Sequence, residues 1–418
     1  MKKLGKYSMG VGDRFGRQAE AQLKAIVDAG KKGVEITPVW NKSNREHLII
    51  GTQPGDVREK ANAAVKALKY RKSYFVDADH INFDTVNRFI EASDFFTIDV
   101  AAYIGQKAGE EDIKAFIKKA EKYKGKLLIR GIPKPFSITG PYLRKVAEKY
   151  LFATKMAGVI YRKIEQVKGE GNFVTEVSMD EVPEPQTPAE LFFILMMLGI
   201  EKILLQTIAP KFRGRFNKGV DYVGDPELFA LEFEADLMVI KRAVKEFKLP
   251  ENLKISVHSG SDKFAIYPFI GKILRKHDAG IHLKTAGTTW LEEVTGLAMA
   301  GNEALKFVKR MYKEAYENID ELCAPYADVI DINKERLPSP ASVMKWDGKK
   351  FASSLIHNQE NPDYNPDLRQ LIHVGYKLAA HKMNEYLNLL DKNRKIVSEC
   401  VYENIYNKHI CRLFGIKS

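Results

Sequence analysis

Three histidines in this 418-residue sequence stand where short apolar runs, typical of buried strands, come to an end. They are His80, His258 and His282. Neutral imidazoles from separate strands can converge on one divalent cation and leave coordination positions open for a substrate. The alternative is that each is a core or loop histidine held by one hydrogen bond. The shared placement favours one metal ion, with zinc preferred and manganese, nickel or cobalt as alternatives, because histidine and carboxylate ligands accept all four.

Carboxylates and a lysine accompany these histidines as candidate catalytic groups. Asp79 directly precedes His80, and Lys284 follows two residues after His282 on the same predicted strand. Glu176 lies on another predicted strand and is expected to be either a fourth metal ligand or a base. Asp79 is expected to transfer protons, although helix capping is the alternative role for an aspartate in such a loop.

Further charged residues at predicted strand ends are candidate substrate contacts: Asp13, Arg14, Lys211, Arg213 and Asp262. Asp180 also follows a strand, but no role is assigned to it. The loop 211–218 is basic, so it is either a clamp for a carboxylate or phosphate or a solvated surface loop. The glycines at 10, 12 and 16 do not have the spacing of a dinucleotide-binding fingerprint.

A repeated strand–helix pattern must position these residues. Setting residues 127–132 aside as an extra strand, eight units remain, with strands at 7–12, 33–39, 74–76, 94–100, 173–178, 203–208, 255–258 and 280–285. Eight such units predict an α/β fold of the (β/α)8 TIM-barrel type, with catalytic groups at the carboxyl ends of the strands. A doubly wound sheet is the alternative, because strand order cannot be read from sequence.

We expect the barrel to occupy residues 1–300, with a strand/helix insertion at about 124–170 after the fourth strand. Residues 301–418 are predicted to form a mostly helical extension packed on the barrel, with one candidate strand at 329–332. His373 and His381 lie two helical turns apart in this extension. Both are expected to be packing residues, although His373 could lean over the barrel mouth.

Composition narrows the class of protein. The net charge is +12, but basic and acidic residues alternate along predicted helices, without zinc-finger spacing or a basic tract, so we expect no nucleic-acid partner. This Lys/Glu-rich pattern is also common in heat-stable proteins. No apolar run has the length of a membrane span, no secretory signal is found, and the three cysteines are far apart. We therefore expect a cytoplasmic protein with reduced thiols, in which homo-oligomers are an open question.

Four motifs, at residues 75–80, 175–181, 255–263 and 280–287, resemble the tagaturonate–fructuronate epimerase family over essentially the whole chain. The resemblance implies a metal-dependent barrel that acts on sugar acids in hexuronate catabolism. More distantly, Asp79-His80 and residues 257–261 are similar to the Asp-His and His-Gly-Gly-Ser stretches of class II aldolases. That similarity implies that His80 and His258 are metal ligands and Asp79 an acid–base residue. The role of His282 depends on the barrel argument alone.

The reaction of that family inverts C4 of a 2-ketouronate. Because the C4 hydrogen is not adjacent to the C2 ketone, simple enolisation would invert C3 instead. We therefore expect retro-aldol cleavage and re-formation of the C3–C4 bond through a metal-bound enediolate, with Asp79 or Glu176 as the base and the second carboxylate or Lys284 as proton donor. The alternatives are a class II-type aldolase of a sugar acid or sugar phosphate and a non-catalytic sugar-binding barrel. Redox epimerisation with NAD is less expected, because the glycines at 10, 12 and 16 lack the spacing of a dinucleotide-binding fingerprint.

Overall fold

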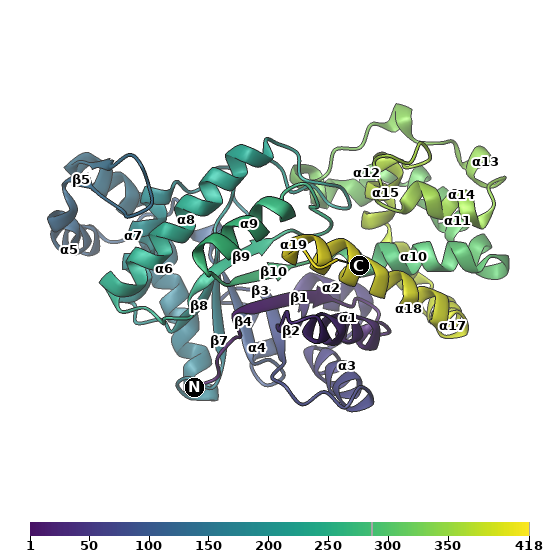
Figure 1. Ribbon diagram of the computed structural model, residues 1–418, viewed down its shortest axis with the longest axis horizontal. Coiled ribbons are helices and arrows are strands. Elements are labelled where there is room, and N and C mark those ends of the chain that lie inside the picture. Colours follow the sequence, from purple (N-terminus) through teal and green to yellow (C-terminus); the bar gives the residue numbers. More distant parts are fainter. Residues whose placement is uncertain (286, 418) are drawn as a thin grey trace.

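Eight parallel strands form a closed barrel with helices around it and a helical region at one end (Figure 1). This computed structural model describes residues 1–285 and 287–417; Ala286, within the motif at 280–287, lies outside the described residues. Pairing of the first barrel strand with the last closes the ring. In order around the barrel the strands are β1 (Tyr7–Gly12), β2 (Ile36–Ser43), β3 (Phe75–Ile81), β4 (Phe95–Asp99), β7 (Val174–Ser178), β8 (Leu205–Ala209), β9 (Lys254–His258) and β10 (Ile281–Lys284). The (β/α)8 prediction is confirmed, and the doubly wound sheet is excluded.

Helices follow the strands and cover the outside of the barrel. They are α1 (Ala19–Lys31), α2 (Asn44–Ile50), α3 (Pro54–Ala67), α4 (Val86–Phe89), α5 (Glu110–Ala120), α6 (Gly140–Lys168), α7 (Pro188–Ile200), α8 (Pro226–Phe247), α9 (Tyr267–His277) and α10 (Thr288–Ala300). Local sequence fixes where several begin. At α7, the Thr187 hydroxyl accepts the Glu190 amide while the Glu190 carboxylate accepts the Thr187 amide, which is a capping box.

The segment between β4 and β7 interrupts the alternation. After α5 it forms an antiparallel pair, β5 (Gly125–Leu127) and β6 (Phe136–Ile138), and then the long helix α6. In Figure 1 this segment lies at the end of the molecule opposite the C-terminal helices. The prediction of one strand at 127–132 is wrong, because the chain turns after Leu127, with Gly131 at a positive φ of 95°, and pairs back on itself.

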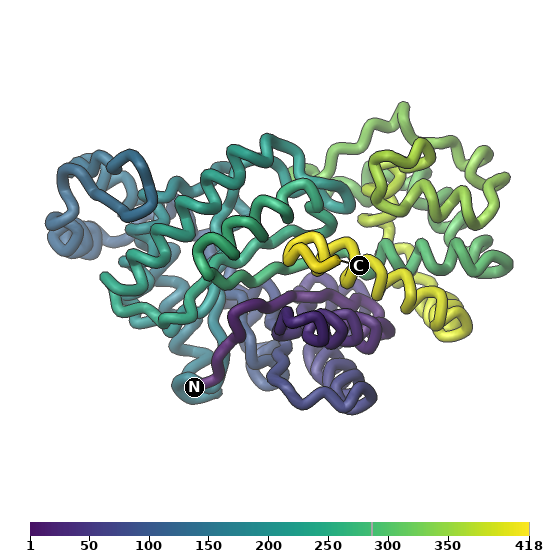
Figure 2. The backbone as a smooth tube through the Cα atoms, viewed as in Figure 1, coloured from purple at the N-terminus to yellow at the C-terminus, as the bar shows by residue number. Residues whose placement is uncertain are grey.

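The C-terminal region is helical, as predicted: α11 (Asn302–Glu317), α12 (Ile319–Cys323), α13 (Pro340–Val343), α14 (Gly348–Leu355), α15 (Pro366–Val374), α16 (Tyr376–His381), α17 (Met383–Lys392), α18 (Arg394–Glu403), the π-helix η5 (Asn404–Cys411) and α19 (Arg412–Phe414). Residues 329–332 form no strand, and a closed barrel offers no free edge for them to join. Figure 2 shows the end of the chain returning to the barrel, where η5 contacts α1. A domain boundary near residue 300 stays a prediction.

Apolar side chains form three clusters, and one of them decides where chemistry can occur. One lies between the barrel and its helices, and another holds the C-terminal helices together. The third is a plug inside the barrel, made of Leu4, Val39, Phe75, Phe95 and Val174. Phe75, Phe95 and Val174 of this plug are the first residues of their strands, whereas His258 and Lys284 are the last residues of theirs. The plug and the candidate catalytic residues therefore lie towards opposite ends of the barrel. Among the described residues, no helix is long and apolar enough to cross a membrane.

Candidate active site

Strand β3 presents two consecutive polar side chains to the barrel mouth. Regular alternation would turn Asp79 and His80 to opposite faces of the strand. The pairing of β3 with β4 slips between Ala78 and Ile81, and His80 adopts a positive φ of 50°. This bulge leaves an extra residue in β3, so that Asp79 and His80 both face the mouth. A left-handed conformation at a non-glycine residue costs free energy and is often found at functional sites.

Lys284 of β10 is the centre of a buried charge cluster. Its Nζ lies 2.9 Å from Asp77 Oδ2, 2.7 Å from Asp79 Oδ1 and 3.4 Å from Glu176 Oε1. Nζ also donates to the Thr97 hydroxyl at 2.7 Å. One ammonium thus faces three carboxylates, and the cluster has an excess of negative charge. The predicted catalytic residues Asp79, Glu176 and Lys284 are therefore neighbours; their roles stay predictions.

Burial and charge act against each other in this cluster. Burial raises the pKa of Asp77 to about 6, against the opposing effect of Lys284. Burial also disfavours the ionised forms of Asp79 and Glu176, but Lys284 and the nearby imidazoles hold the pKa of both below the usual range. Despite its own burial, Lys284 has a pKa well above its usual value because Asp77 and Asp79 face it. The charged forms of Asp79, Glu176 and Lys284 are therefore favoured at neutral pH, whereas Asp77 titrates nearest to neutrality.

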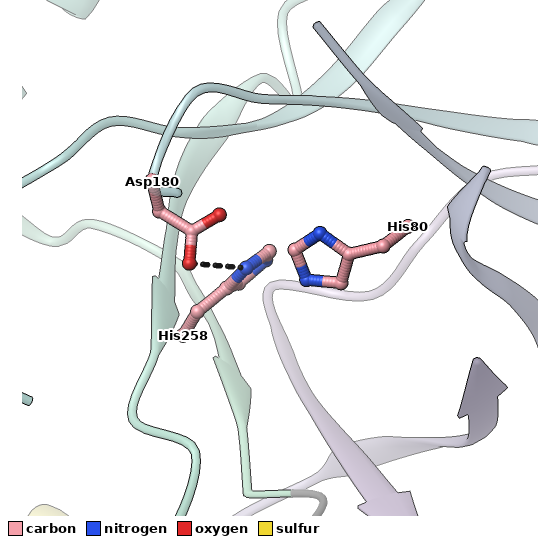
Figure 3. A group of neighbouring side chains, drawn as sticks. All are labelled: His80, Asp180 and His258. Atoms are coloured by element: carbon pink, nitrogen blue, oxygen red, sulfur yellow. Dashed lines mark ion pairs between the residues drawn. The ribbon is translucent and has the colours of Figure 1, made fainter. Parts of the chain in front are cut away.

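His80, His258 and Asp180 approach one another at the mouth (Figure 3). One potential ligand atom of each residue lies within 4.8 Å of those of the other two. The imidazole rings are 5.1 Å apart between centroids, and His258 Nδ1 is 3.2 Å from Asp180 Oδ2. That contact lacks hydrogen-bond geometry, and Nδ1 has no hydrogen-bond partner in the described part of the chain. An imidazole nitrogen and a carboxylate oxygen this close together, with a second imidazole beside them, can act as ligands of one cation.

Carboxylates outside this trio orient both imidazoles. His258 Nε2 is 2.8 Å from Glu176 Oε1, and His80 Nδ1 is 3.1 Å from Asp99 Oδ2. This leaves His258 Nδ1 and His80 Nε2 for the centre. A carboxylate on the second nitrogen of each histidine is typical of metal sites. His80, His258 and Asp180 thus fit a divalent cation.

Neighbouring carboxylates favour the protonated form of both imidazoles. Against the effect of burial, Asp180 and Glu176 raise the pKa of His258 to about 9. Asp79 and Asp99 likewise raise the pKa of His80 well above its usual value, although burial lowers it. A cation that binds these nitrogens must therefore displace protons, so its affinity should rise with pH.

A cavity of about 490 Å³ opens beside His80. This volume suits a small substrate. Asp99, Glu181, Glu184 and Lys149 are the charged residues on its wall in addition to His80. His80, Asp99 and Glu181 form a second trio that could hold a cation. We favour the first trio, because the His80–Asp99 hydrogen bond already uses one atom of each residue.

His282 lies below this trio. It is fully buried, its Nδ1 is 2.9 Å from Ser8 Oγ, and its ring packs 5.2 Å from that of Phe95 in the apolar plug. Burial lowers the pKa of His282 to about 3, and the charge of Lys284 contributes. The structure does not group His282 with His80 and His258. Its role as a ligand stays a prediction that the geometry does not support.

Among the predicted substrate contacts, Asp13 and Arg14 have structural partners near the mouth. The Asp13 carboxylate accepts the Gly16 amide at 2.9 Å and the Gln18 amide at 2.7 Å, which holds the start of α1. Arg14 donates from Nε to Glu46, but its buried Nη1 has no partner among the described residues. Arg14 therefore keeps a free donor, whereas Asp13 acts on the backbone.

Two other candidates are engaged away from the trio. Arg213 is half exposed and pairs with Glu232 at 3.0 Å, so the predicted clamp is not formed by this residue. Lys211 is anchored by its backbone amide, which donates to Gln186 Oε1 at 2.7 Å. Gln186 lines the 490 Å³ cavity, so Lys211 begins its loop beside that cavity.

Asp262 is completely buried and joins the barrel to the C-terminal region. It accepts from Arg369 Nη2 at 2.7 Å, and lies 3.0 Å from His409 Nε2 and 3.2 Å from His357 Nδ1. The π-helix η5 brings Asn404 and His409, five residues apart, to the same carboxylate. All these bonds leave Asp262 no open side for a substrate.

Three site residues received no role from sequence: Asp77, Asp99 and Asp180. Asp77 shares the inward parity of Asp79, and Asp99 ends β4, so alternation and strand ends could have indicated both. Asp180 follows β7 by two residues, and only the course of its loop turns it towards His258.

A parallel barrel with a buried carboxylate–imidazole–lysine cluster at its carboxyl end defines an enzyme of the (β/α)8 class. Residues 1–414 match the family of tagaturonate epimerases, UxaE, and the chain belongs to this family of epimerases. The tagaturonate/fructuronate epimerase of Thermotoga maritima is 27% identical over 429 aligned residues, which cover 98% of this chain and 81% of the relative.

Solved structures support the fold. A glycerol complex of the fructuronate-tagaturonate epimerase UxaE from Cohnella laeviribosi superposes with a TM-score of 0.81 at 24% identity, covering 98% of this chain and 81% of that protein. The native crystal structure of the same protein gives 0.80 at 24% identity over the same shares. The family resemblance seen in the sequence is confirmed.

Proposed function

We propose that this protein interconverts D-tagaturonate and D-fructuronate at C4, in hexuronate catabolism, with the help of one divalent cation. The observation that carries the proposal is the trio His80, His258 and Asp180, which lies beside the Lys284 cluster and a cavity of suitable volume. The family match and the Thermotoga maritima relative support the choice of substrate.

The trio would hold the cation, and Glu176 and Asp99 would orient its two imidazoles. When bound, the cation supplies Lewis-acid stabilisation of negative charge on substrate oxygens. Glu176 is fully buried and its Oε1 already contacts His258 and Lys284, so we assign it a positioning role. This assignment leaves Asp79 as the general base.

Asp79 lies next to His80 and 2.7 Å from the Lys284 ammonium. In the forward direction its carboxylate accepts the proton of the C4 hydroxyl, and the C3–C4 bond breaks. The bonding electrons remain on the ketone fragment as an enediolate, and C4 becomes an aldehyde. After the aldehyde rotates, C3 attacks its other face, and Asp79 returns the proton to the new C4 oxygen. Lys284 keeps Asp79 ionised before the first transfer and after the second.

Proton NMR in D₂O tests the route. The purified protein is incubated with Mn²⁺ or Zn²⁺ and D-fructuronate. In the proposed route the hydrogen on C4 never leaves its carbon, so we expect tagaturonate with hydrogen at C4. Deuterium at C4 would show direct deprotonation and would refute the carbon–carbon cleavage step. Accumulation of free three-carbon fragments would instead identify an aldolase.

His258→Ala tests the metal trio. We expect at least a hundredfold loss of kcat/KM that excess metal does not restore, because metal ligation by imidazole is lost. The matched control is His277→Ala: that histidine pairs with Glu234 on the outside of the barrel, and its removal should leave activity unchanged. Full activity of His258→Ala would rule the trio out.

A further inference from the structure

A second group of nitrogen donors faces the barrel mouth from the loops that follow β8, β9, β10 and β1, which are neighbours in the barrel. The cavity beside His80 is lined instead by residues that follow β3, β4 and β7. We call this group the cationic recess; it consists of Arg14, Lys218 and His373, with Gly260 and Gly287 between them. The C-terminal region contributes His373, through α15.

His373 is the least satisfied member of the recess. Its side chain belongs to a residue that is only 2% exposed, and neither ring nitrogen has a hydrogen-bond partner among the described residues. A Cβ atom placed on Gly287 would lie 2.4 Å from His373 Nε2. The imidazole therefore lies against the residue that precedes α10, a helix of 13 residues whose amino terminus favours an anion. A buried donor left without a partner is costly unless a ligand satisfies it.

The largest charge effects on His373 come from four cationic side chains. Together with burial, Arg14, Lys218, Arg369 and Lys263 lower the pKa of His373 well below its usual value. The side chains of Arg369 and Lys263 are buried and already hydrogen-bonded. They therefore contribute positive charge near His373 but no free donor for a ligand.

Lys218 can reach a ligand directly, whereas Arg14 contributes its charge from a buried position. The buried Nη1 of Arg14 has no partner in the described part of the chain. A Cβ atom placed on Gly260 would lie 4.0 Å from Lys218 Nζ. Lys218 and Gly260 are both partly exposed. Arg14 is already paired with Glu46, whereas Lys218 has no acidic partner among the described residues and is available for an anion.

We propose that the cationic recess binds the carboxylate of the sugar-acid substrate and so sets the preference for uronates over neutral ketoses. The inference rests on the proposed function. Gly260 follows His258 by two residues, so their Cα atoms are at most about 7 Å apart, within the reach of a six-carbon chain. Lys218 and Arg14 supply charge, and His373 donates one N–H group.

The opposite side of the mouth is less suited to a carboxylate. Asp99, Glu181 and Glu184 line the cavity there, and its one lysine, Lys149, is 3.6 Å from Glu184. An anionic group placed among these acids would be repelled. The basic loop 211–218 thus serves the predicted anion contact through its last residue, Lys218, while Arg213 pairs with Glu232.

The test compares D-fructuronate with D-fructose, which lacks the carboxylate, for Lys218→Met and His373→Gln. We expect KM for D-fructuronate to rise about tenfold or more in each variant, as for the loss of one charge-assisted hydrogen bond. kcat/KM for D-fructose should stay within twofold. Arg215→Met, in the same loop but paired with Asp331, and His381→Gln, exposed on α16, are the matched controls and should change neither value.

Titration calorimetry with D-fructuronate gives a second readout that needs no turnover. Equal losses for both sugars, or unchanged affinity in both variants, would overturn the recess as a carboxylate site. If the wild-type protein epimerises neither sugar, yet Lys218→Met weakens D-fructuronate binding tenfold, the proposed function fails while the recess stands. If the wild type is active and the variants keep its KM, the recess fails alone. Lys218 is partly exposed, so its variant should fold even if His373→Gln does not.

Discussion

Replacing Lys284 with methionine should destabilise the protein in a way that depends on pH. Lys284 is 3% exposed and is the one ammonium among Asp77, Asp79 and Glu176. Removing one partner of a buried ion pair costs about 3–5 kcal/mol, because the remaining charge is left unpaired in a poorly solvated place. Three carboxylates share this lysine, so we expect the upper end of that range at pH 8.

Protonation of Asp77 relieves part of this loss. Burial raises the pKa of Asp77 from 3.8 to about 6 in the folded protein, so the folded state binds more protons than the unfolded state between these values. The contribution of Asp77 to stability therefore falls as pH rises through this window and levels off above pH 6. In the variant the lysine no longer lowers the pKa of Asp77, so the fall continues towards pH 8 at about 1.4 kcal/mol per pH unit. The loss caused by Lys284→Met should be about 2–3 kcal/mol larger at pH 8 than at pH 6.

Urea unfolding followed by far-UV circular dichroism at pH 6 and pH 8 measures this difference. Adding Asp77→Asn to Lys284→Met removes the titrating group and should flatten the pH dependence. Lys309→Met is the matched control, because Lys309 is also buried but donates to the carbonyl oxygens of Met344 and Trp346, so its loss should not depend on pH. Equal losses for Lys284→Met at both pH values would refute the reasoning.

Three further predictions concern other carboxylates. Burial, with Asp13 nearby, raises the pKa of Glu293 from 4.5 to about 8, so ionisation of Glu293 destabilises the folded state as pH rises through that window. Glu293→Gln removes this effect. In thermal unfolding the variant should be about 2–4 kcal/mol more stable than the wild type at pH 8 and equal to it at pH 4. Asp262→Asn removes the nearest carboxylate from the buried Arg369 guanidinium, leaving Glu292 at 3.6 Å, and should cost about 3–5 kcal/mol by urea unfolding. A cost below about 1 kcal/mol would contradict the role of Asp262 at this junction. Asp180→Asn should weaken divalent-cation binding at least tenfold by calorimetry, whereas His282→Gln should not, and equal weakening would contradict the trio.

Much of the site followed from the sequence because it depends on local rules. Strand–helix alternation predicted the barrel, and parallel strands in a barrel end on one face. That rule placed His80, His258 and Lys284 at one mouth, and the structure groups them there. Asp79 and Glu176 joined them for the same reason.

Only the tertiary structure decided how deep each side chain lies in the barrel and which residues it contacts. Alternation tells which side chains face the interior, but strand tilt and stagger set their height, so His282 lies beside the apolar plug while His258 lies at the mouth. The bulge in β3 turns both Asp79 and His80 inward, which a period of two cannot predict. His373 and Arg369 reach the barrel from more than a hundred residues beyond Asp262, and only the packing of the C-terminal helices brings them there. Local pattern determines the face on which a residue lies, whereas contacts distant in sequence determine what it meets.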